Sequence, residues 1–190
     1  QGGAIRNAGT LTLTACTLIG NRGFNGGAIY NAETGDLTVS ACTLSGNHAG
    51  EAGGGIANDG YLALFSSVLF ANSAEEGGGG LVSSSLQENT VAACAFEGNT
   101  ASFAGAIGNG WMLTVADSTF VENTAGIGGA IMNLHTLTLA NSTLTANVAS
   151  GMAQMPGLGG GGLANMYTAT IRHTTFAGNS APPRARAAAS

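Results

Sequence analysis

The ten carboxylates of this 190-residue chain are the residues that could most readily do chemistry. Two carboxylates about 5–9.5 Å apart can hydrolyse a glycosidic bond. The acids here follow no common spacing, and none has a basic residue beside it that could act as the base of a polysaccharide lyase. They are Glu33, Asp36, Glu51, Asp59, Glu75, Glu76, Glu88, Glu97, Asp117 and Glu122. We therefore predict no catalytic residues and expect that the chain is not an enzyme.

The sequence also lacks the patterns of a metal site and of a basic binding surface. His48, His135 and His173 follow no ligand spacing, and no phosphate-binding loop, catalytic triad or calcium-binding repeat occurs. We predict no metal site and no cofactor. The net charge of −5, with arginines only towards the two ends and no lysine, argues against a nucleic-acid partner. No run of about 18 apolar residues occurs, so we expect no membrane insertion.

Any functional side chain must be positioned by a repeat that fills nearly the whole chain. Seven copies each carry a Gly-Gly-Ala-Ile-like piece, an apolar-Thr-apolar piece and a Cys/Ser-Thr-Leu/Phe piece. The first apolar column contains Ile5, Ile29, Ile56, Leu81, Ile107, Ile131 and Leu163. The second contains Leu13, Val39, Leu64, Val91, Val115, Leu139 and Ile171. The third contains Leu18, Leu44, Leu69, Phe96, Phe120, Leu144 and Phe176.

Apolar and polar residues alternate inside each piece, which predicts three short strands per copy with one buried face. Three strands in 24–27 residues are typical of one coil of a single-stranded right-handed parallel β-helix. We therefore predict an all-β solenoid of about seven coils, in which equivalent residues stack about 4.8 Å apart. Residues 1–181 would form this domain, and residues 182–190 would form a C-terminal tail.

Two columns of asparagine mark corners between the predicted strands. The first contains Asn7, Asn31, Asn58, Asn109, Asn133 and Asn165, with Ser83 in the fourth copy. The second contains Asn21, Asn47, Asn72, Asn99, Asn123, Asn147 and Asn179. Asparagines stacked in register can hydrogen-bond along the stack and to the turn backbone. We predict two structural asparagine ladders.

The three cysteines share one inward position, two residues before the third apolar column. Cys16 and Cys42 fall in neighbouring coils, so their Cα atoms would lie about 4.8 Å apart, within the range of a disulfide. Stacked parallel side chains seldom reach the required dihedral angle, so free thiols that pack as small apolar groups are the favoured interpretation. A Cys16–Cys42 disulfide is the alternative, and Cys94 has no partner in either case.

Residues 150–162 lengthen one copy by about eight residues, and outward threonines line the strands. A tolerated flexible loop is the simple interpretation of the insertion. Met152 and Met155 make it a candidate contact loop, since methionine suits adaptable binding surfaces. The threonine column runs through Thr12, Thr38, Thr90, Thr114, Thr138 and Thr170. Threonine is the usual choice for an exposed strand position, with ice binding as an alternative.

The alternation of Gly-Gly-Ala-Ile with a Phe-x-x-Asn element resembles the repeats of the chlamydial-type polymorphic outer membrane proteins and of bacterial β-helix adhesins. The first motif is plain at Gly2, Gly26 and Gly128, and the second at Phe96, Phe120 and Phe176. The resemblance covers nearly the whole chain. It implies a secreted β-helix of a bacterial cell surface, with host-cell or glycan surfaces as partners.

The two ends are in phase, because the seventh copy finishes where another Gly-Gly-Ala-Ile strand is due. We therefore expect the chain to be its own partner in a head-to-tail filament, with a fragment of a longer rod as the rival explanation. The candidate assembly residues are Gly2, Gly3 and Ile5 at one end and Phe176, Asn179, Arg184 and Arg186 at the other.

Together these observations predict a non-enzymatic, secreted, structural or adhesive protein. A β-helix that binds or degrades polysaccharide is the first alternative, because many β-helix proteins act on such chains. An ice-binding protein is the second.

Overall fold

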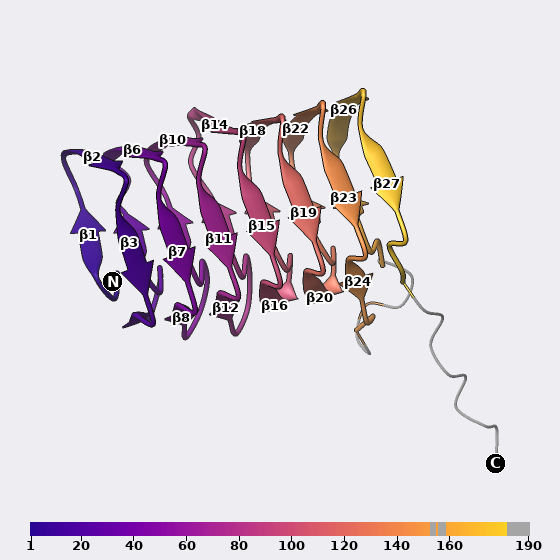
Figure 1. The fold of residues 1–190 in the computed structure, drawn as a ribbon, viewed down its shortest axis with the longest axis horizontal. Helices are drawn as coiled ribbons and strands as arrows, with labels where there is room; N and C mark the ends of the chain where they lie inside the picture. Colours follow the sequence, from indigo (N-terminus) through magenta and orange to yellow (C-terminus); the bar gives the residue numbers. More distant parts are fainter. Residues whose placement is uncertain (153–154, 156–158, 182–190) are drawn as a thin grey trace, which may run out of the picture.

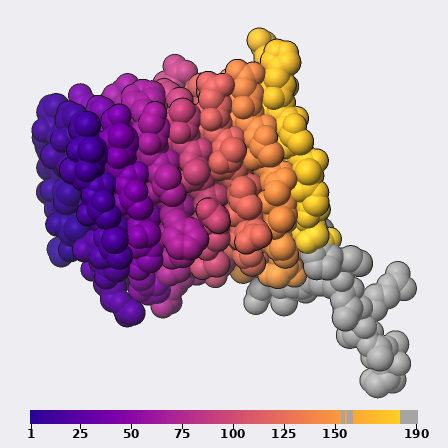
Figure 2. Space-filling model, viewed as in Figure 1, coloured from indigo at the N-terminus to yellow at the C-terminus, as the bar shows by residue number. Residues whose placement is uncertain are grey.

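The computed structural model of the chain is a right-handed parallel β-helix, and it describes residues 1–152, 155 and 159–181. The described residues form 27 strands and no helix, in four parallel sheets that surround one apolar core (Figure 1). Successive turns stack as a series of bands along the rod (Figure 2). The predicted all-β solenoid is confirmed.

Three sheets have seven strands each. Sheet A contains β1 (Ile5–Asn7), β5 (Ile29–Asn31), β9 (Ile56–Asn58), β13 (Leu81–Ser83), β17 (Ile107–Asn109), β21 (Ile131–Asn133) and β25 (Leu163–Asn165). Sheet B contains β2 (Thr10–Thr14), β6 (Asp36–Ser40), β10 (Tyr61–Phe65), β14 (Glu88–Ala92), β18 (Met112–Ala116), β22 (Thr136–Ala140) and β26 (Thr168–Arg172). Sheet C contains β3 (Thr17–Ile19), β7 (Thr43–Ser45), β11 (Val68–Phe70), β15 (Ala95–Glu97), β19 (Thr119–Val121), β23 (Thr143–Thr145) and β27 (Thr175–Ala177).

A fourth, narrower sheet was not predicted. Sheet D contains β4 (Arg22–Gly23), β8 (His48–Ala49), β12 (Ser73–Ala74), β16 (Thr100–Phe103), β20 (Thr124–Ile127) and β24 (Val148–Ala149). Strands of two to four residues are too short to show an alternating pattern, which is why the sequence indicated only three strands per coil. The seven copies form six complete turns of four strands and a seventh turn that the structure describes with three.

The three apolar columns meet inside the rod. Ile56, Leu64 and Leu69, from the third turn, are fully buried and belong to one continuous core. The rings of Phe96 and Phe120 stack in successive turns, with centroids 5.0 Å apart and planes 9° from parallel. Because every turn repeats the same inward positions, each core residue packs on its equivalents above and below.

The corner between sheets B and C explains the cysteine column. The residue before each cysteine or serine has a positive φ, as at Ala41 (53°) and Ser66 (46°), so the chain turns sharply there. The next side chain then donates to the carbonyl oxygen two residues back: Ser67 Oγ to Phe65 at 2.7 Å, and Cys42 Sγ to Ser40 at 3.2 Å. The cysteines thus take the place of serine. All three are free thiols, as favoured from the sequence.

Candidate functional site

The second asparagine column forms an unbroken hydrogen-bonded ladder on the inner side of the corner between sheets C and D. Asn72 shows its pattern. Its Nδ2 donates to Oδ1 of Asn99 at 3.1 Å and to the carbonyl oxygen of Leu44 at 2.9 Å. Its Oδ1 accepts from the backbone N–H of Asn47 at 3.0 Å and from Nδ2 of Asn47 at 2.9 Å. Every polar atom of the buried amide is therefore bonded, which makes this ladder a structural element.

The first asparagine column, at the corner between sheets A and B, is interrupted in the fourth turn. Asn31 donates to Asn58 at 2.7 Å, and Asn58 donates to Ser83 Oγ at 3.3 Å. The ladder resumes from Asn109, which donates to Asn133 at 2.7 Å. Oδ1 of Asn109 is buried and has no hydrogen-bond partner. The short serine side chain in the fourth turn therefore leaves one buried acceptor unsatisfied.

Asn89 occupies the interior beside this interruption. It pairs in register with Leu113, and the core residues of the other turns at this position are apolar. Its Nδ2 donates to Ser83 Oγ at 3.0 Å and to the carbonyl oxygen of Gln87 at 3.1 Å. Its Oδ1 accepts from the backbone N–H of Leu62 at 2.7 Å. A fully buried asparagine thus ties the start of β14 to the preceding corner and to the neighbouring strand.

Sheet B opens at the same place. β10 and β14 pair over three residues, from Ala63 to Phe65 in β10. The pairs β6–β10 and β14–β18 each extend over five residues. Where β10 and β14 no longer pair, the backbone N–H of Leu62 donates to Asn89 Oδ1 instead of to a backbone carbonyl oxygen. The separation leaves a gap at the corner between turns three and four.

The corners between sheets A and B also differ in length around this gap. Four residues connect sheets A and B in the second turn (32–35) and in the fourth turn (84–87). Only two residues, Asp59 and Gly60, make the same connection in the third turn. Two long corners therefore flank a short one, and a hollow lies between them.

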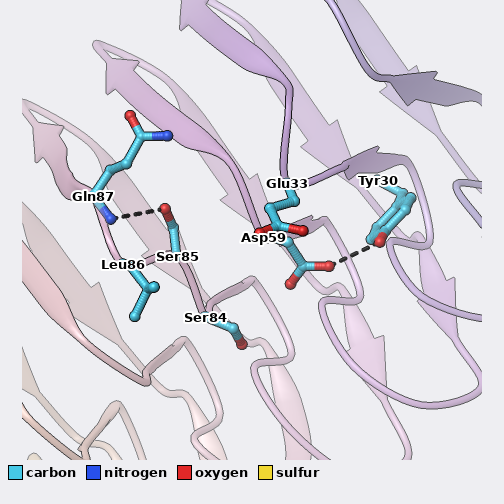
Figure 3. Close-up of a pocket in the computed structure, with 7 residues that line it drawn as sticks. All are labelled: Tyr30, Glu33, Asp59, Ser84, Ser85, Leu86 and Gln87. Carbon is cyan, nitrogen blue, oxygen red and sulfur yellow. Dashed lines mark hydrogen bonds between the residues drawn. The ribbon is translucent and has the colours of Figure 1, made fainter.

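This hollow, which we term the corner notch, has a volume of about 530 Å³. It is lined by Tyr30, Glu33, Asp59, Ser84, Ser85, Leu86 and Gln87. Figure 3 shows Tyr30, Glu33 and Asp59 on one side and residues 84–87 on the other. The lining comes from turns two, three and four, and the volume is within the range of small-molecule sites.

The tyrosine and the aspartate of the corner notch are held in place by their neighbours. Tyr30 Oη donates to Asp59 Oδ2 at 2.8 Å, and this hydrogen bond raises the pKa of Tyr30. The guanidinium carbon of Arg6 lies 6.0 Å from the centre of the Tyr30 ring, over its face. The carboxylate of Glu33 is exposed. The corner notch therefore presents fixed acceptors, hydroxyl groups and one amide to a ligand.

An aromatic column continues along the same corner. Trp111, His135 and Tyr167 each come directly before a strand of sheet B, as Gln87 does before β14. The centroids of Trp111 and His135 are 4.6 Å apart, and those of His135 and Tyr167 are 5.2 Å apart. Trp111 and Tyr167 are 40% and 68% exposed. This aromatic column covers turns five to seven, directly beyond the corner notch.

The other candidate residues lie apart from the corner notch. Gly2, Gly3 and Ile5 lie in the first turn, and Phe176 and Asn179 in the last. Arg184 and Arg186 lie outside the described residues. Met152 and Met155 form an isolated antiparallel bridge, with a backbone hydrogen bond of 3.2 Å, in the insertion.

Sequence reasoning missed the corner notch. Glu33 and Asp59 were treated as unrelated acids because they occupy different offsets in the repeat, yet both line the same hollow. The available signal was the corner length, which is longer by two residues in the second and fourth copies. Within residues 1–152, 155 and 159–181, no group of three or more His, Cys, Asp or Glu side chains could hold a metal ion.

Comparison with known proteins gives no relative: no family model, curated protein or solved structure matches this chain. In the part of the chain that the structure describes, no helix is long and apolar enough to cross a membrane.

Proposed function

We propose that this chain is a non-enzymatic adhesive β-helix that binds polysaccharide at the corner notch. Asn89 is the observation that carries the proposal. A buried asparagine in an otherwise apolar core position needs hydrogen bonds to offset its desolvation. One of these bonds connects Asn89 to Gln87, a residue of one wall of the corner notch, and another connects it to Ser83, directly before that wall. Departures from the local rules of a fold are expected where function requires them.

The lining of the corner notch suits a ligand rich in hydroxyl groups. The carboxylates of Glu33 and Asp59 accept hydrogen bonds, while the amide of Gln87 and the hydroxyls of Ser84 and Ser85 can both donate and accept. Carboxylate acceptors form the stronger, charge-assisted type of hydrogen bond. Sugar hydroxyls can satisfy acceptors and donors at once, so a glycan suits the exposed polar groups of the lining.

Binding without cleavage fits the groups present. A lyase needs a base beside a positive charge. The lining holds no arginine, lysine or histidine, and Arg6 lies over the face of the Tyr30 ring, with its guanidinium carbon 6.0 Å from the ring centre. Asp59 already accepts a hydrogen bond from Tyr30 Oη at 2.8 Å, so one of its carboxylate oxygens is engaged within the protein. Secretion to a bacterial surface is part of the proposal, and it is supported by the resemblance of the repeats to those of surface adhesins.

The test is a glycan array followed by calorimetry on the best glycan, with release of reducing ends measured in parallel. Asp59→Asn and Glu33→Gln should each weaken binding about tenfold or more, whereas Glu97→Gln on β15 should leave it unchanged. Binding accompanied by new reducing ends would favour an enzyme instead. If nothing on the array binds, or if Asp59→Asn binds as well as the native chain, the proposal is wrong.

Self-association is a second candidate function, and the last turn provides the observation that favours it. Ile171 and Phe176 are 42% and 43% exposed, whereas Leu139 and Leu144 at the same positions one turn earlier are fully buried. Further β-helix turns, including those of a second copy, would cover this apolar end. We expect concentration-dependent filaments in electron micrographs, and Phe176→Asp should abolish them. Dispersed short rods at high concentration would exclude this function.

A further inference from the structure

We infer that the aromatic column extends the corner notch into one track, and that the ligand is a linear, neutral polysaccharide lying along the rod axis. This inference rests on the proposed function and specifies its ligand.

The corner notch and the aromatic column are joined by the register of the strands in sheet B. The first residues of β14, β18, β22 and β26 pair in sequence as Glu88, Met112, Thr136 and Thr168. The residues directly before them, Gln87, Trp111, His135 and Tyr167, therefore follow one another along the corner. Gln87 lines the corner notch, so it is both the wall of the hollow and the first member of this row. The three following turns add about 14 Å of surface at 4.8 Å per turn.

The surface of this extension is apolar and partly preorganised. Trp111 is the only tryptophan of the chain, and it shares this row with the rings of His135 and Tyr167. Leu134 and Met166, in the same corners, are also exposed. The Trp111 and His135 rings are tilted by 41°, and the His135 and Tyr167 rings are stacked at 21°. Rings in contact restrict one another, so less side-chain entropy is lost when a ligand covers them. Exposed apolar surface of this kind marks an interaction site.

The chemistry of the corner notch and of the aromatic column restricts the class of ligand. Pyranose units with equatorial hydroxyls present C–H groups on their faces and hydroxyls at their edges. The C–H groups can pack on aromatic and apolar side chains, and the hydroxyls can bond the carboxylates and amide of the corner notch. Glu33 and Asp59 disfavour sugars that carry carboxylates or sulfates, since like charges repel. A β-1,4-linked chain of glucose units has these features along its whole length.

The test uses cello-oligosaccharides of two to six units and oligogalacturonates of matched length, titrated calorimetrically into the native chain. Affinity should rise at least tenfold from the dimer to the hexamer, and the oligogalacturonates should bind more weakly. Trp111→Ala and Tyr167→Ala should remove most of the gain with length and leave the affinity for the dimer unchanged. Asp59→Asn should weaken binding at every length. Phe70→Ala, which removes an exposed ring from sheet C, is the matched control.

The outcomes separate this inference from the proposed function. Equal affinity for dimer and hexamer, or a length dependence unaffected by Trp111→Ala, would overturn the track and leave the corner notch as the site. Tighter binding of oligogalacturonates, or failure of cello-oligosaccharides when another glycan binds through Asp59, would overturn the assigned ligand class. The absence of any Asp59-dependent glycan binding would instead refute the proposed function. Circular dichroism of each variant checks that it is folded.

Discussion

The side-chain amide of Asn89 donates a hydrogen bond to the hydroxyl of Ser83 at 3.0 Å in the interior of the rod. These two residues replace an asparagine of the first ladder and an apolar residue of the core. Ser83 leaves room for Asn89, and Asn89 reaches residues 84–87. The two exceptional residues therefore contact each other directly behind the wall of the corner notch.

The Ser83–Asn89 pair should show strong energetic coupling. Asn89→Leu removes the acceptor for Leu62 N–H and should lower the free energy of unfolding by about 1–3 kcal/mol. Ser83→Asn forces a larger side chain against Asn89 and should cost about 1–3 kcal/mol. The double variant restores both columns and provides a donor for Asn109, so it should be more stable than either single variant. Urea unfolding of the native chain, the two single variants and the double variant measures the coupling energy. Simple additivity of the two changes in free energy would contradict this prediction.

The same double variant should lose glycan affinity, because residues 84–87 are no longer held by Asn89. Calorimetry with the glycan selected on the array checks this. Retention of native affinity in a folded double variant would show that Asn89 does not position the wall of the corner notch.

The second asparagine ladder should be most sensitive in its interior. Asn72→Ala removes four hydrogen bonds and leaves buried backbone groups unsatisfied, so it should cost about 3 kcal/mol or more. The matched control is Asn21→Ala at the start of the ladder. Asn21 donates one side-chain bond, to Asn47 at 2.9 Å, and its loss should cost about 1 kcal/mol. Equal losses of thermal stability in the two variants would contradict a cooperative ladder.

Two glycines, one in the left-handed region and one in close contact with the next turn, should respond differently to alanine. At Gly46 (φ 61°) an added Cβ meets no atom within 4 Å, and Ala71 occupies the equivalent corner with a φ of 51°. Gly46→Ala should therefore cost only about 1 kcal/mol. A Cβ on Gly54 would lie 2.3 Å from the carbonyl oxygen of Gly79, so Gly54→Ala should cost on the order of 3 kcal/mol or more. Thermal unfolding of the two variants ranks them, and a milder effect at Gly54 would show that the turn spacing can relax.

Stability should fall at alkaline pH because of Cys94. Burial raises the pKa of the Cys94 thiol to about 11. The unfolded chain releases this proton near pH 9, whereas the folded chain keeps it until about pH 11. The unfolded state therefore binds fewer protons in this window, and stability declines as pH rises through it, by at most about 1.4 kcal/mol per unit. Cys94→Ser should lessen this decline, because serine serves the same position in Ser67 and Ser118.

Cys16→Ser is the control for this pH dependence, since Cys16 lies in the first turn and is half-exposed. Urea unfolding between pH 8 and pH 11 compares the three proteins. An identical decline in Cys94→Ser and in the native chain would assign the effect to other groups, including Tyr30, whose pKa is also raised.

The repeat made the fold predictable, and its irregularities determined what was missed. Residues such as Ile56 and Leu69 recur in every copy because each turn imposes the same packing, so the columns are visible in one sequence. Sheet D was missed because a strand such as β8 has only two residues. The corner notch was missed because it depends on a difference between neighbouring turns. Asn89 stands two residues before Val91, where the neighbouring copies have Leu62 and Leu113, so the sequence columns already contained the signal for this polar exception.

The shortened pairing between β10 and β14 also bears on how the rod comes apart. In a linear array, cooperativity passes from each repeat to the next through their shared interface. The weakest interface therefore separates two blocks, turns one to three and turns four to seven, which can open at different free energies. Amide protons on the two sides would then exchange with solvent as two groups. A glycan seated in the corner notch touches both blocks, so its binding would fasten them into one cooperative unit.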